Sequence, residues 1–174
     1  MKHFLVIVDI QKDFVDGALG TQEAQAMVPL AAERISAFPG EIFVTYDTHF
    51  ENYLDTAEGK KLPVKHCIKG TPGWQLDAAI AKALEGKAYT PVEKLTFGSV
   101  ELPRMILEAA GEEDFDITLL GLCTDICVVS NALILKANFP EKEISVLSAC
   151  CAGVTPESHE AALTTMAMCQ IHVK

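Results

Sequence analysis

The stretch DITLLGLCTDICVVSNALILKANF (116–139) decides the fold, because it joins a strand pattern directly to a helix pattern. Its first seven residues (116–122) form a largely apolar run, which is typical of a strand that is covered on both faces. Over residues 125–139 the apolar positions recur at helical spacing, which predicts an amphipathic helix. A strand that leads through a short turn into a helix is the repeating unit of α/β proteins.

The same alternation runs along the rest of the chain. Apolar runs that predict buried strands lie at residues 4–8, 41–46, 88–92, 116–122, 143–149 and 171–173. Helical patterns lie between most of them, at residues 27–38, 74–86, 99–111, 125–139 and 156–168. Such alternation favours right-handed crossovers and a sheet with helices on both faces. We therefore expect an α/β fold, a three-layer α/β/α sandwich around a mostly parallel sheet of about six strands.

Length and composition limit the classes of protein that the sequence can encode. A chain of 174 residues fits one domain, so we expect a single domain over residues 1–174. The formal charge of −10, from 14 basic and 24 acidic side chains, argues against binding to nucleic acid, which draws on clustered Lys and Arg. The apolar run FLVIV (4–8) is followed by Asp9 and is far too short to span a membrane. We therefore expect a cytoplasmic protein that binds neither nucleic acid nor membranes.

The sequence contains six cysteines, but a chain of this length can build a hydrophobic core without disulfides. We therefore expect free thiols. Cys150 and Cys151 end a strand pattern and Cys169 lies in an apolar helical pattern, so all three are interpreted as small buried hydrophobic residues.

Polar and reactive side chains follow four of the predicted strands. Asp9 follows the first strand, Asp47 the second, Lys94 the third, and the fourth leads into GLCTDIC (121–127). In open parallel sheets, functional sites form beyond the carboxyl ends of the strands, so these groups should meet at one edge of the sheet. The segment 47–73 is long, polar and without clear periodicity, and we predict a functional loop there.

Cys127 is the candidate nucleophile. Thr124 or Asp125 is a suitable N-cap for the helix that follows, which puts Cys127 in its first turn. The helix dipole and the Lys94 ammonium would stabilise a thiolate there, and Asp9 could accept and return the proton. A buried structural cysteine is the alternative for Cys127 taken alone, but the two charged groups at neighbouring strand ends favour chemistry.

Cys123 has a different predicted role. It lies four residues before Cys127, in the turn, and this spacing matches neither a CxxC redox pair nor a zinc knuckle. We expect its backbone, rather than its sulfur, to contribute to the site.

A candidate metal site lies in the polar segment. Asp47, His49 and His66 offer a carboxylate and two imidazoles, a ligand set that suits zinc, iron or manganese. Three protein ligands leave positions open for water or substrate, and Glu58 could supply a fourth ligand directly or through water. A purely structural role stays open as the alternative for both histidines. The histidines outside this segment are interpreted as structural: His3, His159 and His172.

Six motifs along the chain resemble those of the isochorismatase-like cysteine hydrolase superfamily, and within it the nicotinamidase branch. They are DIQKDF (9–14), DTH (47–49), LPVKHCIKGTPGW (62–74), EKLTFGS (93–99), GLCTDICV (121–128) and HEAAL (159–163). The motifs stand in the family's order and span nearly the whole chain. The resemblance implies a Rossmann-like hydrolase fold. Three positions differ from the usual nicotinamidase pattern: Lys12, Leu62 and Ile126.

The resemblance also implies roles for individual residues. The family's catalytic triad of Asp, Lys and Cys falls on Asp9, Lys94 and Cys127. Its oxyanion hole falls on the backbone N–H groups of Cys123 and Cys127. A cis peptide bond that is common in the family falls between Leu122 and Cys123, and Leu122 is expected to contact the substrate.

The implied cofactor is a divalent metal, with zinc as the first choice and iron or manganese as alternatives. The family's ligands match Asp47, His49 and His66, and in some members a Glu that matches Glu58 joins them. Phe14 matches an aromatic position that lines the substrate pocket. Because the family commonly forms dimers or tetramers, we also expect a homodimer or homotetramer.

The leading prediction for the activity is cleavage of the C–N bond of a small amide through a thioester on Cys127. Nicotinamide, which would give nicotinate and ammonia, is the first candidate substrate. The same triad could act on another small amide, on an N-carbamoyl compound, or on isochorismate, whose ether-cleaving enzymes lack the metal trio. A non-catalytic metal or thiol module is the alternative from a different class of protein.

Overall fold

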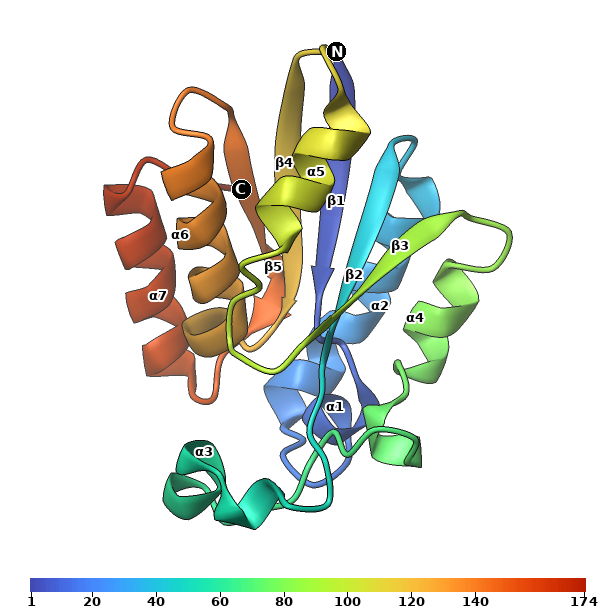
Figure 1. Ribbon diagram of the computed structural model, residues 1–174, viewed down its shortest axis with the longest axis vertical. Coiled ribbons are helices and arrows are strands. Elements are labelled where there is room, and N and C mark those ends of the chain that lie inside the picture. Colours follow the sequence, from blue (N-terminus) through green and yellow to red (C-terminus); the bar gives the residue numbers. More distant parts are fainter.

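A computed structural model describes residues 1–174 as a six-stranded sheet covered by helices (Figure 1). The strands are β1 (Lys2–Val8), β2 (Glu41–Asp47), β3 (Tyr89–Lys94), β4 (Phe115–Leu122), β5 (Ile144–Ala152) and β6 (His172–Val173). Their order in the sheet is β3-β2-β1-β4-β5-β6, and every neighbouring pair is parallel. The predicted α/β fold with a parallel sheet of six strands is confirmed.

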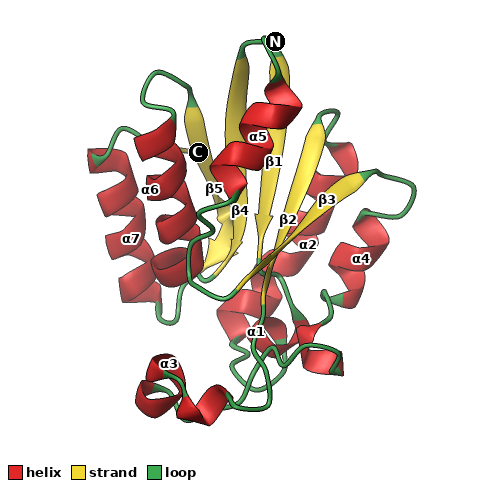
Figure 2. Cartoon of the chain, viewed as in Figure 1, coloured by secondary structure: helices red, strands yellow, loops and turns green.

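Helices cover both faces of the sheet, so the molecule has three layers (Figure 2). One face carries α2 (Gln22–Ala37) and α4 (Ala78–Ala83), and the other carries α5 (Leu102–Ala110), α6 (Val129–Asn138) and α7 (Pro156–Met168). From β1 the chain adds β2 and then β3 on one side of β1 in the sheet. It then crosses to the other side of β1, where β4, β5 and β6 follow, so the crossovers change direction. Because each crossover is right-handed, this reversal moves the later helices to the opposite face. The short helices α1 (Lys12–Val15) and α3 (Ala57–Lys61) lie beyond the carboxyl ends of the strands.

The centre of the hydrophobic core lies along β1 and its neighbours. Phe4 of β1 is fully buried, and its ring packs edge-on against Phe43 of β2 at 5.8 Å and Phe115 of β4 at 5.6 Å between centroids. Fully burying one such side chain stabilises the fold by about 1.5–3 kcal/mol. The core thus fixes the three strands whose carboxyl ends carry most of the polar groups.

Gly121 lets β4 approach β1 closely at this end of the sheet. A Cβ atom at Gly121 would lie 2.1 Å from the carbonyl oxygen of Val8, and the backbone φ of +134° is one that other residues rarely adopt. The pairing of β4 with β5 also shifts register between Leu119 and Gly121. The last residues of β4 are therefore held against the end of β1.

The polar segment 47–73 contains more regular structure than its sequence predicts. It holds the 3₁₀ turn η1 (Tyr53–Asp55) and helix α3, and the turn η2 (Pro72–Trp74) follows at its end. Thr56 begins α3, because its hydroxyl accepts a hydrogen bond from the N–H of Gly59 at 3.0 Å. These helices have only three to five residues, which is too short to produce a recognisable period in the sequence.

All six cysteines are free, as predicted. Cys150 and Cys151 are buried at the end of β5, but Cys169 is exposed. The prediction of a buried Cys169 is wrong because α7 ends one residue earlier and leaves Cys169 at its exposed C-cap. None of the helices has the length and hydropathy needed to cross a membrane.

Candidate active site

Asp9, Lys94 and Cys127 come together beyond the carboxyl ends of β1, β3 and β4. Lys94 Nζ lies 2.6 Å from Asp9 Oδ2 and 3.6 Å from Cys127 Sγ. All three residues are buried, and Asp9 has no exposed surface at all. The structure thus gathers a carboxylate, an ammonium and a thiol into one buried cluster.

The carboxylate of Asp9 has a fixed orientation. The backbone of Asp9 turns out of β1 with a φ of +47°. The hydroxyl of Thr45 donates a hydrogen bond to Asp9 Oδ1 at 2.6 Å, while Oδ2 faces Lys94. Since one oxygen is held by Thr45, the other is kept next to the ammonium and the thiol.

The surroundings of Cys127 disfavour its thiolate form. Burial raises the pKa of Cys127 well above its usual range, the charge of Asp9 raises it further, and the Lys94 ammonium only partly opposes them. This direction is opposite to the predicted stabilisation of a thiolate by the helix start and Lys94. A thiol that keeps its proton would need a base, the role predicted for Asp9. Burial also raises the pKa of Asp9, although Lys94 opposes this shift, which makes Asp9 better able to accept a proton.

The turn that carries the thiol differs from the predicted helix start. Residues Thr124–Val128 form the π-helical turn η3, and its N-cap is Cys123, which makes no side-chain cap. Thr124 and Asp125 are therefore not N-caps. The Thr124 hydroxyl lies 2.8 Å from Nδ1 of His159, and Asp125 accepts a backbone N–H bond from the segment after β5. Thr124 thus contacts α7, and Asp125 contacts the segment between β5 and α7, instead of capping the helix.

The backbone around Cys123 agrees with its predicted role. The Leu122–Cys123 peptide bond is cis, as the family resemblance implies. The N–H of Cys123 donates no hydrogen bond to another group of the protein, and Cys123 lines the same cavity as Cys127. Burial raises the pKa of the Cys123 thiol to about 12. A backbone donor is thus available for an oxyanion beside a sulfur that stays protonated.

One donor atom from each of three side chains, those of Asp47, His49 and His66, lies within 4.8 Å of the other two, next to this cluster. Asp47 Oδ2 lies 3.0 Å from His49 Nε2 and 3.5 Å from His66 Nε2. Glu58 Oε1 lies 3.7 Å from each of these two nitrogens. The separations of 3.0 and 3.5 Å suit ligands of one ion with bonds of about 2.0–2.2 Å, whereas Glu58 lies near the two imidazoles without joining the trio.

The chemistry of the three donors of this trio also fits a metal. His66 Nδ1 donates to the carbonyl of Val64 at 2.8 Å, which leaves Nε2 free to act as a ligand. Burial acts to raise the pKa of Asp47, but hydrogen bonds from His49 and His66 outweigh it and lower that pKa far below its usual range. A carboxylate that stays ionised beside two imidazoles suits zinc, iron or manganese.

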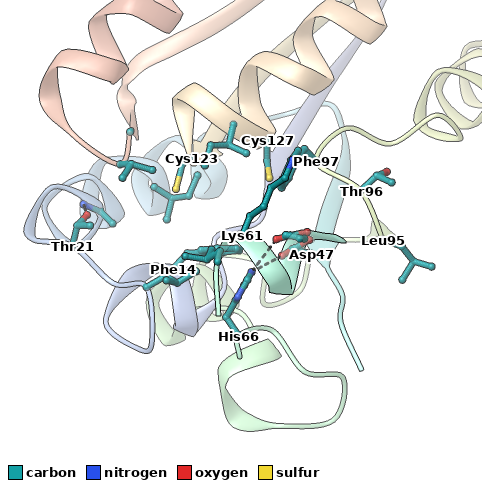
Figure 3. Close-up of a pocket in the computed structure, with 18 of the residues that line it drawn as sticks. Phe14, Thr21, Asp47, Lys61, His66, Leu95, Thr96, Phe97, Cys123 and Cys127 are labelled. Carbon is teal, nitrogen blue, oxygen red and sulfur yellow. Dashed lines mark hydrogen bonds and ion pairs between the residues drawn. The ribbon is translucent and has the colours of Figure 1, made fainter. Parts of the chain in front are cut away.

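A cavity of about 620 Å³ joins the thiol to the metal-binding cluster (Figure 3). Figure 3 shows the sulfur of Cys127 and the side chains of Asp47 and His66 facing the same space. Apolar side chains form most of its wall, among them Phe14, Leu62, Phe97, Leu122 and Ile126. All the residues selected from the sequence lie in or beside this cavity: Asp9, Lys94, Cys127, Cys123, Asp47, His49, His66, Glu58, Phe14 and Leu122.

Gln11 is a fully buried residue that the sequence pattern did not single out. Its Nε2 donates to the carbonyls of Asp47 and Trp74, both at 2.9 Å, and its Oε1 accepts from the N–H of Asp47 at 2.8 Å. The side-chain amide of Gln11 thus both donates to and accepts from the backbone of Asp47, as a neighbouring strand would. These bonds fix the backbone of Asp47, a candidate metal ligand. Its place three residues after β1, within the motif DIQKDF (9–14), was the signal that could have pointed to Gln11.

We expect the alkylation of Cys127 by iodoacetamide to keep accelerating above about pH 9 in the metal-free protein. A raised pKa means that the thiolate fraction is small near neutral pH and grows as the pH rises. Mass spectrometry of the modified peptides would give the rate, with the exposed Cys169 as a reference thiol in the same sample. A Cys127 rate that levels off below about pH 8 would contradict the protonated resting thiol.

Comparison with known proteins agrees with this geometry. The family described as the Isochorismatase domain matches residues 3–173. The chain is also 29% identical over 145 residues to the isochorismatase family protein PncA of Bacillus subtilis, across 76% of this chain and 78% of that protein.

Solved structures share the whole fold. The nicotinamidase/pyrazinamidase PncA from Bacillus subtilis has a TM-score of 0.84 at 26% identity, with 99% of both chains covered. The pyrazinamidase of Pyrococcus horikoshii in complex with zinc has a TM-score of 0.82 at 26% identity, with 100% of this chain and 99% of that chain covered. The N-carbamoylsarcosine amidase from Thermoplasma acidophilum has a TM-score of 0.79 at 27% identity, with 100% and 96% covered. The family that the motifs predict is confirmed: the chain belongs to the isochorismatase family, within which it is an amidohydrolase.

Proposed function

We propose that the protein hydrolyses nicotinamide to nicotinate and ammonia through a thioester on Cys127. The observation that carries this proposal is the buried contact of Lys94 Nζ with Asp9 at 2.6 Å and with Cys127 at 3.6 Å, at the base of a largely apolar cavity. An apolar cavity of this kind suits a flat aromatic ring. The nicotinamidase and pyrazinamidase among the solved relatives support the substrate class.

The first half of the reaction forms the thioester. Asp9 accepts the thiol proton while Cys127 Sγ attacks the amide carbonyl carbon. The carbonyl oxygen becomes an oxyanion and receives hydrogen bonds from the N–H groups of Cys123 and Cys127, each worth about 3 kcal/mol in such sites. As the C–N bond breaks, Asp9 gives its proton to the leaving nitrogen, and ammonia departs. Lys94 stabilises the anionic groups throughout.

The second half releases the acid. Asp9 takes a proton from a water molecule while the oxygen of that water attacks the thioester carbonyl carbon. The same two backbone donors stabilise the second oxyanion. When the C–S bond breaks, the sulfur of Cys127 takes the proton back from Asp9, and nicotinic acid leaves and gives its carboxyl proton to water to become nicotinate. The site returns to its starting protonation state.

The residues that would hold a metal are Asp47, His49, His66 and Glu58, and zinc is the ion that we propose. When bound, such an ion supplies a Lewis acid that can ligate a pyridine nitrogen or polarise water. Gln11 and Val64 would orient the ligands through their hydrogen bonds to Asp47 and His66.

Protein purified without chelators should contain about one zinc, iron or manganese ion per chain, and His66→Ala should weaken its retention at least tenfold. Loss of one buried nitrogen donor leaves a carboxylate pair and a single imidazole. Elemental analysis after dialysis would measure the metal content, and His172→Ala, which changes an exposed histidine, is the matched control. Equal metal content in the His66→Ala variant and the unaltered protein would rule this site out.

A second candidate function keeps the triad and changes the substrate to an N-carbamoyl compound. The similarity to the N-carbamoylsarcosine amidase structure favours it over other amides. Isochorismate fits less well because it carries two carboxylates, whereas Lys61 is the only Lys or Arg that lines the cavity. The buried contact of thiol, ammonium and carboxylate argues against a non-catalytic module.

An ammonia-release screen tests the proposed function. Nicotinamide, pyrazinamide and small N-carbamoyl compounds would be offered to the protein loaded with zinc, manganese or iron. The highest kcat/KM is expected for nicotinamide. Faster turnover of an N-carbamoyl compound would support the second candidate, and release from none of them would contradict both.

The proposal extends to location and assembly. Six free thiols fit a reducing compartment, for which we propose the cytoplasm. Exposed apolar side chains support self-association into a homodimer or homotetramer. Examples are Val100, just before α5, and Leu107, on α5. Sedimentation velocity at two protein concentrations would test the assembly.

A further inference from the structure

Asn131 is a fully buried polar residue on α6 for which the reaction has no use. Its Nδ2 donates to the carbonyl of Cys127 at 2.8 Å and to the carbonyl of Phe97 at 3.3 Å. Its Oδ1 accepts from the N–H of Ser99 at 2.9 Å. One side-chain amide therefore joins the nucleophile's turn to the residues that follow Lys94.

These residues, 95–99, are called the pocket loop here because Leu95, Thr96 and Phe97 line the cavity. Phe97 is still 46% exposed, so burial alone fixes its ring only in part. The loop lies directly on α6, since a Cβ atom at Gly98 would come within 2.5 Å of Ile134. The contact between the pocket loop and α6 thus combines apolar packing at Ile134 with the buried hydrogen bonds of Asn131 to Phe97 and Ser99.

We propose that Asn131 is a positioning residue that sets how tightly the cavity holds its substrate. By binding both Phe97 and Ser99, it keeps the pocket loop against α6 and the Phe97 ring in the cavity wall. Without it, the buried N–H of Ser99 and the carbonyl of Phe97 would lose their partner, and the loop would have to move to find water. The triad lies outside the loop, so substrate binding should suffer more than chemistry. The inference rests on the proposed function for the identity of the substrate.

Asn131→Ser separates the two contacts of this side chain. A serine hydroxyl on a helix can donate to the carbonyl four residues earlier, as Ser130 does to Ile126 at 2.6 Å. The Cys127 carbonyl therefore keeps a partner, while both bonds to the pocket loop are lost. We expect KM for nicotinamide to rise about tenfold, with kcat within about twofold of the unaltered protein.

Asn138→Ser is the matched control. Asn138 lies on the same helix and donates to the carbonyl of Ile134, again four residues earlier, at 2.9 Å, but it is exposed and touches no loop by hydrogen bonds. Its KM and kcat should both stay within about twofold. An unchanged KM in Asn131→Ser, or a fall in kcat at constant KM, would overturn the positioning role.

Hydrogen exchange at the Ser99 amide gives a readout that does not depend on any substrate. Exchange should be faster in Asn131→Ser than in the unaltered protein or in Asn138→Ser, because Oδ1 of Asn131 is the acceptor for that amide. Equal exchange in all three proteins would overturn the inference. If the unaltered protein releases no ammonia from nicotinamide, the proposed function fails, and the exchange at Ser99 still decides whether Asn131 holds the loop.

Discussion

Cys127→Ala is expected to lower kcat/KM for amide hydrolysis by about 10⁴-fold or more. Cys127 Sγ is the proposed nucleophile next to Lys94 Nζ, and neither Lys94 nor Asp9 can form the thioester in its place. The missing sulfur leaves only a small void, so the loss of stability should be about 1–2 kcal/mol. Ammonia release and thermal unfolding of the same preparation would separate the loss of chemistry from a loss of folding.

Cys123→Ala is the matched control for this change. Cys123 lines the same cavity, but its proposed contribution is a backbone N–H, which alanine keeps. We expect its activity to stay within about threefold of the unaltered protein. If Cys127→Ala kept a tenth or more of the activity, the thioester mechanism would be wrong, and a large loss in Cys123→Ala would assign the sulfur of Cys123 a role.

Asp9→Asn should reduce kcat by about 10³–10⁴-fold and also destabilise the fold. The amide has the size of the carboxylate but cannot accept the thiol proton. It also removes the charge that lies 2.6 Å from Lys94 Nζ, and the next carboxylate oxygen, on Asp47, is 3.6 Å away. A buried ammonium with a weaker partner costs about 3 kcal/mol of unfolding free energy. Steady-state kinetics and urea unfolding would measure the two effects.

The double variant Asp9→Asn with Lys94→Met tells these effects apart. Methionine removes the buried ammonium and keeps an apolar chain of similar length, so much of the lost stability should return while activity stays absent. A single Asp9→Asn variant with full activity would show that Asp9 is not the base. One that unfolds at the same urea concentration as the unaltered protein would show that the ion pair with Lys94 adds little stability.

The sheet and the groups at its edge could be predicted because both follow from short-range patterns. Apolar runs identify strands, and the parallel arrangement brings their carboxyl ends to one edge, so Asp9, Lys94 and Cys127 could be selected without knowing any distance. The candidate metal ligands could be selected from residue type and from their place in a polar segment between two strands.

Other features depend on long-range contacts that a sequence pattern does not contain. The thiolate prediction considered a helix start and Lys94, but not the complete burial that raises the pKa of Cys127. Gln11 and Asn131 were missed because an uncharged amide becomes informative only when its backbone partners are known. Apart from the Cys127 carbonyl, four residues before Asn131, those partners lie 32 to 63 residues away. The N-cap was predicted wrongly because Thr124 bonds to His159 of α7 and Asp125 bonds to the N–H of Val154, after β5.

The position of β1 between β2 and β4 divides the site between two halves of the chain. The part that ends with α5 carries Asp9, Lys94 and every candidate metal ligand, whereas the part that begins with β4 carries the thiol and the oxyanion donors. During synthesis on the ribosome, the proposed base and the candidate metal ligands therefore leave the exit tunnel before the proposed nucleophile. The proposed site is incomplete until β4 lies beside β1 and brings Cys127 to Lys94.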